Sequence, residues 1–458
     1  MIEEKIFRDR SIVVYLSYAP AGFGHLRVAD ALYHGLPEYV TPILLGTNDT
    51  SVTFLHRLTS VHPLFRALFV WGQSGVREKF FTILYRRYLH STARNIKQQL
   101  NETIGERIDP VSTIIIVATH FGIAHQVSFI KKELGETLGV KIILVVQVTD
   151  DSPQLIWYMH HADIIFVPSK RTQEVFEKYD TRKSLEKPKL IVAPYPISPF
   201  LGRALTTVEF EKRVSQLSPQ KEREIQMMVP LSGAAVGTKN LETLMENLKR
   251  LNNRFNFHIV VKDAPYTKLF IDRLGKQKEY IKIYKSKNDK AVVNAYEDVY
   301  MSEVIALEIT KPSEQAFKAL YYPKQRGGSI LLFAAPIGRQ EFDNLDFLTR
   351  HKLIPTKTEH VAIWELAKQK NFDSTASMYK AILGGAVHWR GLVLPDDPIV
   401  ASEFINWCLE HDVFRKMSQH EEEQDASAQY ESEVSPNGVE IFWQEVSRYA
   451  KEHLQREP

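Results

Sequence analysis

A histidine and an aspartate that could move a proton stand at the ends of two short apolar runs. His25 follows the run at 12–16 across a glycine-rich turn, and Asp150 follows the run at 142–148. An imidazole titrates near neutral pH and can act as a general base, and a carboxylate can orient that imidazole or an acceptor hydroxyl. We therefore predict His25 as a catalytic base and Asp150 as its orienting partner. Two structural roles remain open, because a single histidine is often structural and an aspartate at this place can cap the following helix.

The turn before His25 is suited to close approach of a ligand. Residues 19–25 read Ala-Pro-Ala-Gly-Phe-Gly-His, and apolar residues at helical spacing follow at 28–32. Glycine lets the backbone approach a ligand closely, and the N-terminus of a helix offers unpaired amides and the positive end of its dipole. Gly22 and Gly24 are therefore predicted ligand contacts, although a tight structural turn would have the same sequence.

Loops in the second half of the chain carry residues that could bind a diphosphate and a sugar. Small residues at 231–238 follow one apolar run, and a lysine-containing loop at 310–315 follows another. Free amides and a lysine can bind diphosphate oxygens, and polar side chains after the run at 330–334 can pair with sugar hydroxyls. The predicted contacts are Ser232, Gly233, Lys311, Ser313, Glu314, Gln340, Glu341 and Asn344. Ordinary turns and a solvated polar loop remain the alternatives.

The elements that position these loops are predicted to be parallel strands that alternate with helices. Short runs rich in β-branched residues recur along the chain, as is typical of strands buried on both faces. They are residues 12–16, 113–118, 142–148, 164–167 and 190–193 in the first half, and 226–231, 257–262, 304–309 and 330–334 in the second. This rhythm predicts doubly wound, Rossmann-like α/β sheets, which bind ligands beyond the carboxyl ends of their strands.

Length and local composition divide the chain into two domains and a C-terminal extension. At 458 residues the chain exceeds the roughly 250–300 residues at which a single core stops growing. Three prolines within 194–200 restrict the backbone to extended or turn conformations and mark a crossover. We predict domains at 1–200 and 201–415, which face each other across a ligand-binding cleft. An acidic linker and a C-terminal amphipathic helix are predicted at 416–458.

Composition argues against several classes of protein. The hydrophobic fraction of 44% and the charged fraction of 25% are those of an ordinary globular protein, and a net charge of +3 does not support nucleic-acid binding. The single cysteine, Cys408, cannot form an internal disulfide, which fits a reducing compartment. The first residues show neither a signal segment nor a run that could span a bilayer. We therefore expect a cytoplasmic protein with no nucleic-acid partner.

The motifs of the first half follow one another in an order known from an enzyme family. The motifs are Gly22-Phe23-Gly24-His25, Thr119-His120, Thr149-Asp150 with Trp157 and Asp163, Val167-Pro168-Ser169, and the crossover Val192 to Phe200, in which Pro194 replaces a glycine. With these motifs the chain resembles, over roughly residues 10–355, the glycosyltransferases of the GT-B fold. That family includes processive diacylglycerol glucosyltransferases, plant monogalactosyldiacylglycerol synthases and the N-acetylglucosaminyltransferase that completes lipid II.

The donor half departs from the pattern of this family. Ser232-Gly233 replaces a Gly-Gly turn, and the segment 311–320 lacks one residue and the double glycine of the family's K-P-G-G-x-T-x-x-E-A-L motif. The acid that the family uses for the donor ribose falls on Lys318, and Glu314 could substitute for it from the previous turn. An extra stretch at 321–328 precedes the next strand, whereas the sugar loop survives at 339–344.

The resemblance implies an inverting glycosyl transfer from a nucleotide-sugar, and the expected donor is a UDP-linked sugar. A base deprotonates an acceptor hydroxyl, whose oxygen displaces the nucleotide diphosphate from the sugar. Thr119, His120, Thr149 and Trp157 would lie on the acceptor side. No metal or other cofactor is expected, because helix-end amides and Lys311 can stabilise the leaving phosphate. A catalytically inactive nucleotide-sugar-binding or regulatory protein and a nucleotide-sugar epimerase remain alternatives.

Residues 56–90 alternate bulky apolar side chains with cations, a pattern typical of a surface that lies in lipid headgroups. The resemblance implies a lipid-linked acceptor, so we expect a peripheral membrane enzyme with exposed aromatic side chains here. The aromatic residues concerned are Phe65, Phe69, Trp71, Phe80 and Phe81. Two helices that pack their apolar faces on the first sheet would show the same pattern, and the acceptor would then be soluble.

Overall fold

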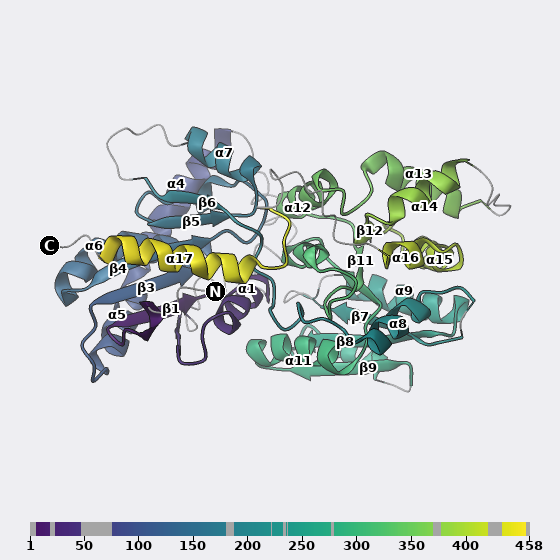
Figure 1. Cartoon of the computed structure of the whole chain (residues 1–458), viewed down its shortest axis with the longest axis horizontal. Coiled ribbons are helices and arrows are strands. Elements are labelled where there is room, and N and C mark those ends of the chain that lie inside the picture. Colours follow the sequence, from purple (N-terminus) through teal and green to yellow (C-terminus); the bar gives the residue numbers. More distant parts are fainter. Residues whose placement is uncertain are drawn as a thin grey trace. The chain divides into compact units, whose positions relative to one another are not determined.

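Two parallel sheets organise the chain, one in each of the two units into which it divides (Figure 1). The computed structural model describes residues 6–18, 23–46, 76–179, 187–220, 222–231, 235, 237–275, 279–369, 377–419 and 433–454. Unit 1 comprises Met1–Pro199 and Glu431–Pro458, and unit 2 comprises Phe200–Tyr430. The division into domains at 1–200, 201–415 and 416–458 remains a prediction. By its contacts, however, the C-terminal helix belongs to unit 1.

Unit 1 contains a six-stranded parallel sheet in the order β2-β1-β3-β4-β5-β6. The strands are β1 (Ile12–Ser17), β2 (Ile43–Leu45), β3 (Thr113–Ala118), β4 (Lys141–Gln147), β5 (Ile164–Val167) and β6 (Lys189–Val192). All five apolar runs of the first half are therefore strands, as predicted. The sequence analysis missed β2, whose three residues are too few for a periodic pattern.

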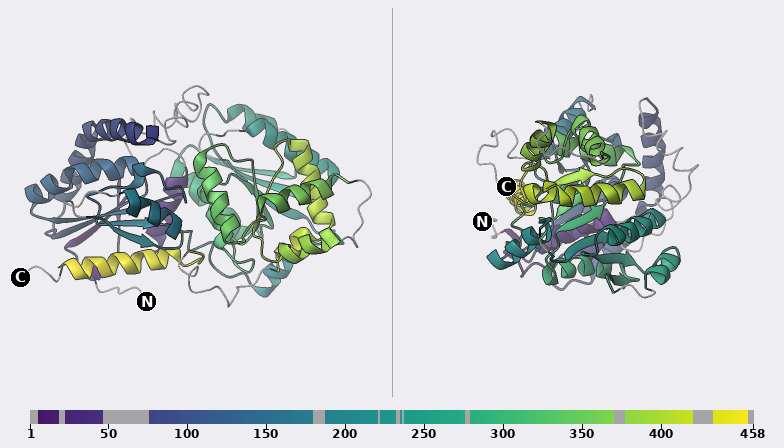
Figure 2. Two further views of the ribbon diagram at one scale, coloured as in Figure 1. Left: turned by 90° about the horizontal axis from the view of Figure 1, so that it is seen from above. Right: turned by 90° about the vertical axis from the view of Figure 1, so that its right-hand side faces the viewer.

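Helices cover both faces of this sheet. They are η1 (Ile6–Arg8), α1 (Phe23–His34), α4 (Val76–Ser91), α5 (Ala93–Gly105), α6 (Phe121–Leu138), η2 (Leu155–Trp157), α7 (Lys170–Tyr179) and α17 (Gly438–Leu454). Alternate strand residues such as Ile114 and Ile116 pack in one cluster with α4, α5, α6 and α7. Figure 2 shows α4 and α17 on opposite faces of the sheet.

The amphipathic C-terminal helix is confirmed as α17, which packs on elements distant in sequence. The Phe442 ring lies 4.4 Å from that of Phe166 on β5, and the Trp443 Nε1 donates to the Leu32 carbonyl of α1 at 2.9 Å. A Cβ on Gly438 would lie 2.4 Å from the Tyr195 carbonyl oxygen. Only glycine therefore lets the start of α17 approach the crossover so closely.

Unit 2 contains a second six-stranded parallel sheet in the order β12-β11-β10-β7-β8-β9. The strands are β7 (Ile225–Pro230), β8 (Phe255–Lys262), β9 (Ile281–Ser286), β10 (Leu307–Thr310), β11 (Ile330–Phe333) and β12 (Gly391–Val393). The four predicted runs are strands, and β9 and β12 were missed. Strand β9 lies at the edge of the sheet and is partly exposed, so it lacks the continuous apolar run of a central strand.

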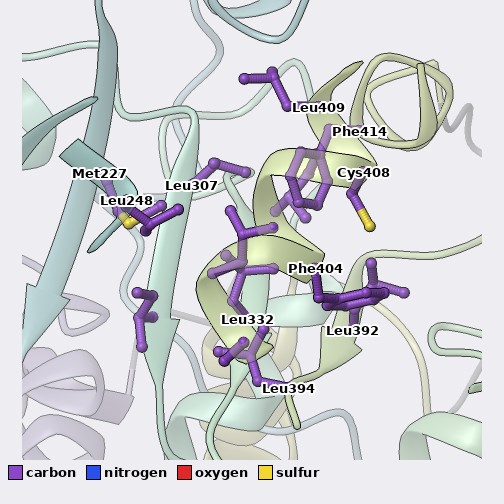
Figure 3. Packing of buried hydrophobic residues seen from close by; sticks show 14 of the residues in the cluster. Met227, Leu248, Leu307, Leu332, Leu392, Leu394, Phe404, Cys408, Leu409 and Phe414 are labelled. Carbon is purple, nitrogen blue, oxygen red and sulfur yellow. The ribbon is translucent and has the colours of Figure 1, made fainter. Parts of the chain in front are cut away.

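The main core of unit 2 lies between this sheet and a layer of helices. The helices of the unit are α8 (Thr207–Gln216), α9 (Thr238–Leu251), α10 (Lys268–Leu274), α11 (Asp289–Ser302), η3 (Glu314–Leu320), α12 (Arg339–Arg350), α13 (Lys357–Ala367), α14 (Ser377–Ala386), α15 (Pro398–Glu410) and α16 (Val413–Met417). Figure 3 shows Leu307 and Leu332 of the sheet facing Phe404 and Cys408 of α15. Burial raises the pKa of the Cys408 thiol, so this cysteine is a core residue.

Both sheets reverse their strand order at one point. In unit 1 the chain runs outward from β1 to β2 and then returns to β3 on the other side of β1; in unit 2 the corresponding neighbours are β7 and β10. Loops that follow two such strands diverge to opposite faces and leave a crevice at the carboxyl edge, where doubly wound proteins bind ligands. These are the loops in which sequence analysis placed His25, Thr119 and Lys311.

Within the described part of the chain, none of the helices combines the length and apolar character required to cross a bilayer.

Candidate active site

His25 lies at the reversal point of the unit 1 sheet, on the first turn of α1. Its ring Nδ1 is 2.8 Å from the main-chain oxygen of Thr119, the residue that follows β3. A carbonyl oxygen can only accept, so Nδ1 carries the hydrogen and donates it. The lone pair of the neutral ring is therefore on Nε2. His25 is partly exposed, and this arrangement sets its Nε2 as the nitrogen that can accept a proton.

Two threonines hold the ring and backbone of His25. The Thr149 hydroxyl oxygen lies 3.2 Å from Nδ1, and the Thr149 carbonyl accepts from the Tyr195 hydroxyl at 3.1 Å. The Thr119 hydroxyl shares its hydrogen between the carbonyls of His25, at 2.9 Å, and Ser17, at 3.1 Å. Both threonines are buried. They therefore act as supports for His25, and the acceptor-side role that the resemblance implies for them remains a prediction.

A wall of aromatic rings adjoins His25. The ring of His120 meets that of His25 edge-on at 4.6 Å, and Phe121 stacks on His120 at 4.5 Å. Trp157 lies 5.5 Å from Phe121 and 6.3 Å from His25 between ring centroids. The His120 Nδ1 accepts from the Gly122 amide at 3.0 Å, so the neutral ring carries its hydrogen on Nε2. The structure thus brings His25, His120 and Trp157 together.

The two aspartates after β4 have different surroundings. Asp151 is buried and accepts hydrogen bonds from the hydroxyls of Ser169 and Thr172, the latter at 2.8 Å. It therefore fixes the start of α7, the kind of capping role that sequence analysis left open for Asp150. Asp150 is partly exposed, and its role as the orienting partner of His25 remains a prediction.

Three residues that were not predicted as site residues contact the backbone of residues 155–158, the segment that contains Trp157. Arg86 on α4 donates from Nη2 to the carbonyls of Leu155 and Tyr158, each at 2.8 Å. Glu78 accepts from the Leu155 amide at 2.9 Å, and the His125 Nε2 lies 2.7 Å from the Ile156 carbonyl. Burial, with Arg86 nearby, lowers the pKa of His125 to about 3. Arg86 lies within residues 56–90, whose cations we predicted to face a membrane surface, whereas its guanidinium is turned to the backbone.

Some of the predicted donor-binding residues are partly exposed at the ends of strands or helices, and others lie outside the described residues. Lys311, Ser313 and Glu314 directly follow β10 and are partly exposed, as is Gln340 on the first turn of α12. Gly24 lies in α1 of unit 1, whereas Gly22, Ser232 and Gly233 lie outside the described residues.

The side chains of Asn344 and Glu341 form hydrogen bonds with main-chain groups. The Asn344 side chain is fully buried, and its Nδ2 donates to the Pro312 carbonyl at 3.2 Å. Glu341 accepts from the Ile337 amide at 2.7 Å, at the start of α12. Asn344 therefore positions the loop that carries Lys311, and a direct sugar contact, which remains a prediction, would require this loop to move.

Lys318 lies in the interior of unit 2, which revises the interpretation of the altered donor motif. Its Nζ is paired with the Glu308 carboxylate of β10, and it also contacts the hydroxyls of Tyr296 and Tyr300 on α11. Lys318 is 5% exposed and Glu308 0%. Burial and the Glu308 charge raise the pKa of Tyr300, which stays neutral. The lysine at the position of the family's ribose acid therefore forms an internal ion pair.

Two buried arginines fix the extra stretch at 321–328. Arg213 donates to the carbonyls of Ile305, Pro323, Gln325 and Arg326, and Arg390 donates to those of Tyr321, Gly328, Ser329 and Met417. Burial lowers the pKa of Arg213 to about 10 and that of Arg390 to about 9, so both stay charged at neutral pH. Because all three nitrogens of each guanidinium donate to main-chain carbonyls, the stretch is fixed along its length.

The described residues contain no group of three or more histidine, cysteine, aspartate or glutamate side chains that could hold a metal ion.

Comparison with known proteins gives matches among solved structures. No protein-family model and no curated protein matches the sequence. The structures include MnaA of S. aureus with UDP (8% identity, 97% of each chain covered, TM-score 0.48). A second match is the UDP-GlcNAc 2-epimerase of Neisseria meningitidis bound to UDP-GlcNAc, with 11% identity, coverage of 95% of this chain and 99% of that chain, and a TM-score of 0.44. A third is a UDP-glucosyltransferase of Polygonum tinctorium, with 12% identity, coverage of 96% of this chain and 98% of that chain, and a TM-score of 0.45. The α/β fold class itself is established by the chain's own two parallel sheets.

Removal of Glu308 alone should leave the Lys318 charge buried without its counter-ion. We expect Glu308→Gln to lower the free energy of unfolding by about 3–5 kcal/mol, because an uncompensated buried charge is strongly destabilising. Lys318→Met in the same chain removes that charge, so the double variant should regain part of the loss. Urea unfolding of the wild type, both single variants and the double variant measures the coupling. Strictly additive losses would show that the two side chains do not act as a pair.

Proposed function

We propose that this chain is a nucleotide-sugar-dependent glycosyltransferase in which His25 is the general base. The proposal is carried by one observation: the hydrogen bond from His25 Nδ1 to the Thr119 carbonyl leaves Nε2 as the proton acceptor at the reversal point of the sheet. The order of the motifs from Gly24 to Trp157, which resembles that of GT-B glycosyltransferases, supports the same assignment.

The proposed reaction is an inverting displacement. His25 Nε2 takes the proton of an acceptor hydroxyl, and that oxygen forms a bond to the anomeric carbon of the sugar. The bond from this carbon to the diphosphate oxygen breaks, and the nucleotide diphosphate leaves with the electron pair. Lys311 and main-chain amides after β7 and β10 would stabilise the negative charge on the leaving group. This chemistry requires no metal or other cofactor.

The proposed donor is a UDP-sugar, with Glu314 in contact with the ribose. Lys318 is held inside unit 2 by Glu308, so it does not offer its charge to a ligand. Glu314, at the start of η3 and partly exposed, is the acid that remains next to the Lys311 loop. A carboxylate accepts hydrogen bonds from both hydroxyls of a ribose.

A second candidate function is a nucleotide-sugar-binding protein without turnover. The internal position of Lys318 favours it, because the ribose acid of the resembled family is absent from that place. The two functions share the donor site and differ in the use of His25.

The proposed acceptor is linked to a lipid, and α4 would contribute to the membrane surface. The five aromatic residues on which sequence analysis based this idea have side chains outside the described residues. Farther along α4, Ile83 and Leu84 are 51% and 50% exposed, Tyr88 is 40% exposed, and Arg87 is exposed beside them. Leu89 is fully buried in the core of unit 1. The helix thus packs on the sheet with one face and offers apolar and cationic side chains on another, as peripheral membrane helices do.

Loss of the His25 base should slow transfer strongly without loss of donor binding. We expect His25→Gln to lower kcat by about 100- to 10,000-fold, the range for removal of a general base, and to leave UDP affinity unchanged. The measurement is UDP release from a panel of UDP-sugars with hydroxyl acceptors, and His388→Gln in unit 2 is the control.

Each outcome of this assay is decisive. Full turnover by His25→Gln would contradict the assignment of the base. UDP binding by the wild type without turnover of any sugar would favour the binding protein, and an isomerised nucleotide-sugar would identify an epimerase.

The α4 surface should bind anionic vesicles. We expect Ile83→Ser/Leu84→Ser to reduce cosedimentation with phosphatidylglycerol vesicles, and binding of the wild type should weaken as salt rises, since cations contribute. Val208→Ser/Leu269→Ser, two exposed apolar residues of unit 2, is the matched control. Equal binding of both variants, or no binding by the wild type at low salt, would favour a soluble acceptor.

A further inference from the structure

A groove of about 1340 Å³ lies in unit 1 at the amino ends of the strands. Its walls come from α6, the first residues of β3 and β4, the loop before β5 and the last turn of α17 (Figure 1). Thr113 is the first residue of β3 and Thr119 follows its last residue, and an extended segment of this length spans about 20 Å. The groove is therefore at the opposite edge of the sheet from His25.

The charged residues that line the groove are mainly lysines. Four lysines line it, two from α6, one from β4 and one from the loop before β6: Lys131, Lys132, Lys141 and Lys187. Four histidines join them: His90, His160, His161 and His453. The carboxylates among the lining residues are Glu136 and Asp163. The excess of cations favours an anionic ligand.

One of the two carboxylates is already used by the protein. Asp163 is paired with Lys131, and its Oδ2 also accepts from the Leu144 amide at 2.6 Å. Lys141 donates to the carbonyl of His453 at 2.6 Å, a neutral group that does not cancel the charge of the lysine. Lys132 and Lys187 are exposed. The lining therefore contains four lysines and two carboxylates, an excess of two positive charges.

The other lining groups suit an oxyanion more than a metal ion. Although four histidines line the groove, the described residues include no cluster with the ligands for a metal. The hydroxyls of Ser112 and Ser128 add neutral donors. A phosphoryl group has three oxygens that accept from ammonium and hydroxyl donors together.

We propose that this groove binds a phosphate-bearing anion, at a site separate from the donor and acceptor sites of the proposed transferase. Two sources have the required chemistry: a soluble phosphorylated metabolite and the headgroup of an anionic phospholipid. Phe129, which lines the groove, is 58% exposed, and its ring stacks on that of His90 of α4 with the ring centroids 4.4 Å apart. The site does not depend on catalysis by His25.

Calorimetry with pyrophosphate tests the soluble source on the full chain. We expect Lys132→Glu/Lys187→Glu to weaken binding by about tenfold or more, since two attractive charges become repulsive ones. Lys178→Glu/Lys368→Glu, which changes the net charge equally at exposed lysines elsewhere, should bind as the wild type does. Binding that is lost in Lys311→Glu instead would belong to the donor site and would overturn the groove as the pyrophosphate site.

Cosedimentation with phosphatidylglycerol vesicles, compared with phosphatidylcholine vesicles, tests the lipid source with the same variants. A loss in the groove variant that is confined to anionic vesicles supports the proposal and identifies a headgroup as the ligand. If the groove variant, properly folded by circular dichroism, retains wild-type affinity for both pyrophosphate and vesicles, the proposal is wrong.

Discussion

The hydrogen bond between His25 Nδ1 and the Thr119 carbonyl joins three elements of unit 1 at one point. The Thr119 amide donates to the Ser17 carbonyl at 3.1 Å, which continues the pairing of β3 with β1, and the Thr119 hydroxyl reaches the first turn of α1. The His25 ring is thus attached to the sheet where its strand order reverses. Any shift of β1 against β3 would change the direction in which Nε2 points. The orientation of the proposed base therefore depends on the packing of the sheet core.

In unit 2, buried charged side chains fix the backbone that follows β10. Three cations, Lys318, Arg213 and Arg390, lie in its interior, where Glu308 neutralises the first and main-chain carbonyls satisfy the other two. Such groups are expensive to desolvate and stabilise a structure only while every donor is paired. Their common effect is to fix η3 and the stretch before β11. The segment between β10 and β11 is therefore held by a buried ion pair and by main-chain hydrogen bonds from two arginines.

The central strands could be predicted from sequence because burial on both faces requires continuous apolar runs, as in β3 and β5. The short strands β2 and β12 carry no such signal, and β9 is partly exposed. At the site, the positions of His25, Thr119 and Thr149 followed from the rule that ligands bind at carboxyl ends. The partners did not follow: Thr119 holds the ring through its main-chain oxygen, which no residue type reveals. Likewise, Arg86 and His125 contact the backbone around Trp157 across long sequence separations. The pairing of Lys318 with Glu308 inside unit 2 could not be predicted from the residue types either.

The tautomer of His25 is the most direct test of this account. Nitrogen-detected NMR of the protein labelled with ¹⁵N-histidine, with the His25 signals assigned by comparison with His25→Gln, distinguishes a protonated ring nitrogen from one with a lone pair. The account predicts that, in the neutral ring, Nδ1 carries the hydrogen and Nε2 is unprotonated. A neutral His25 with its hydrogen on Nε2 would contradict it, because the Thr119 carbonyl would then have no donor and the proposed base would face the backbone.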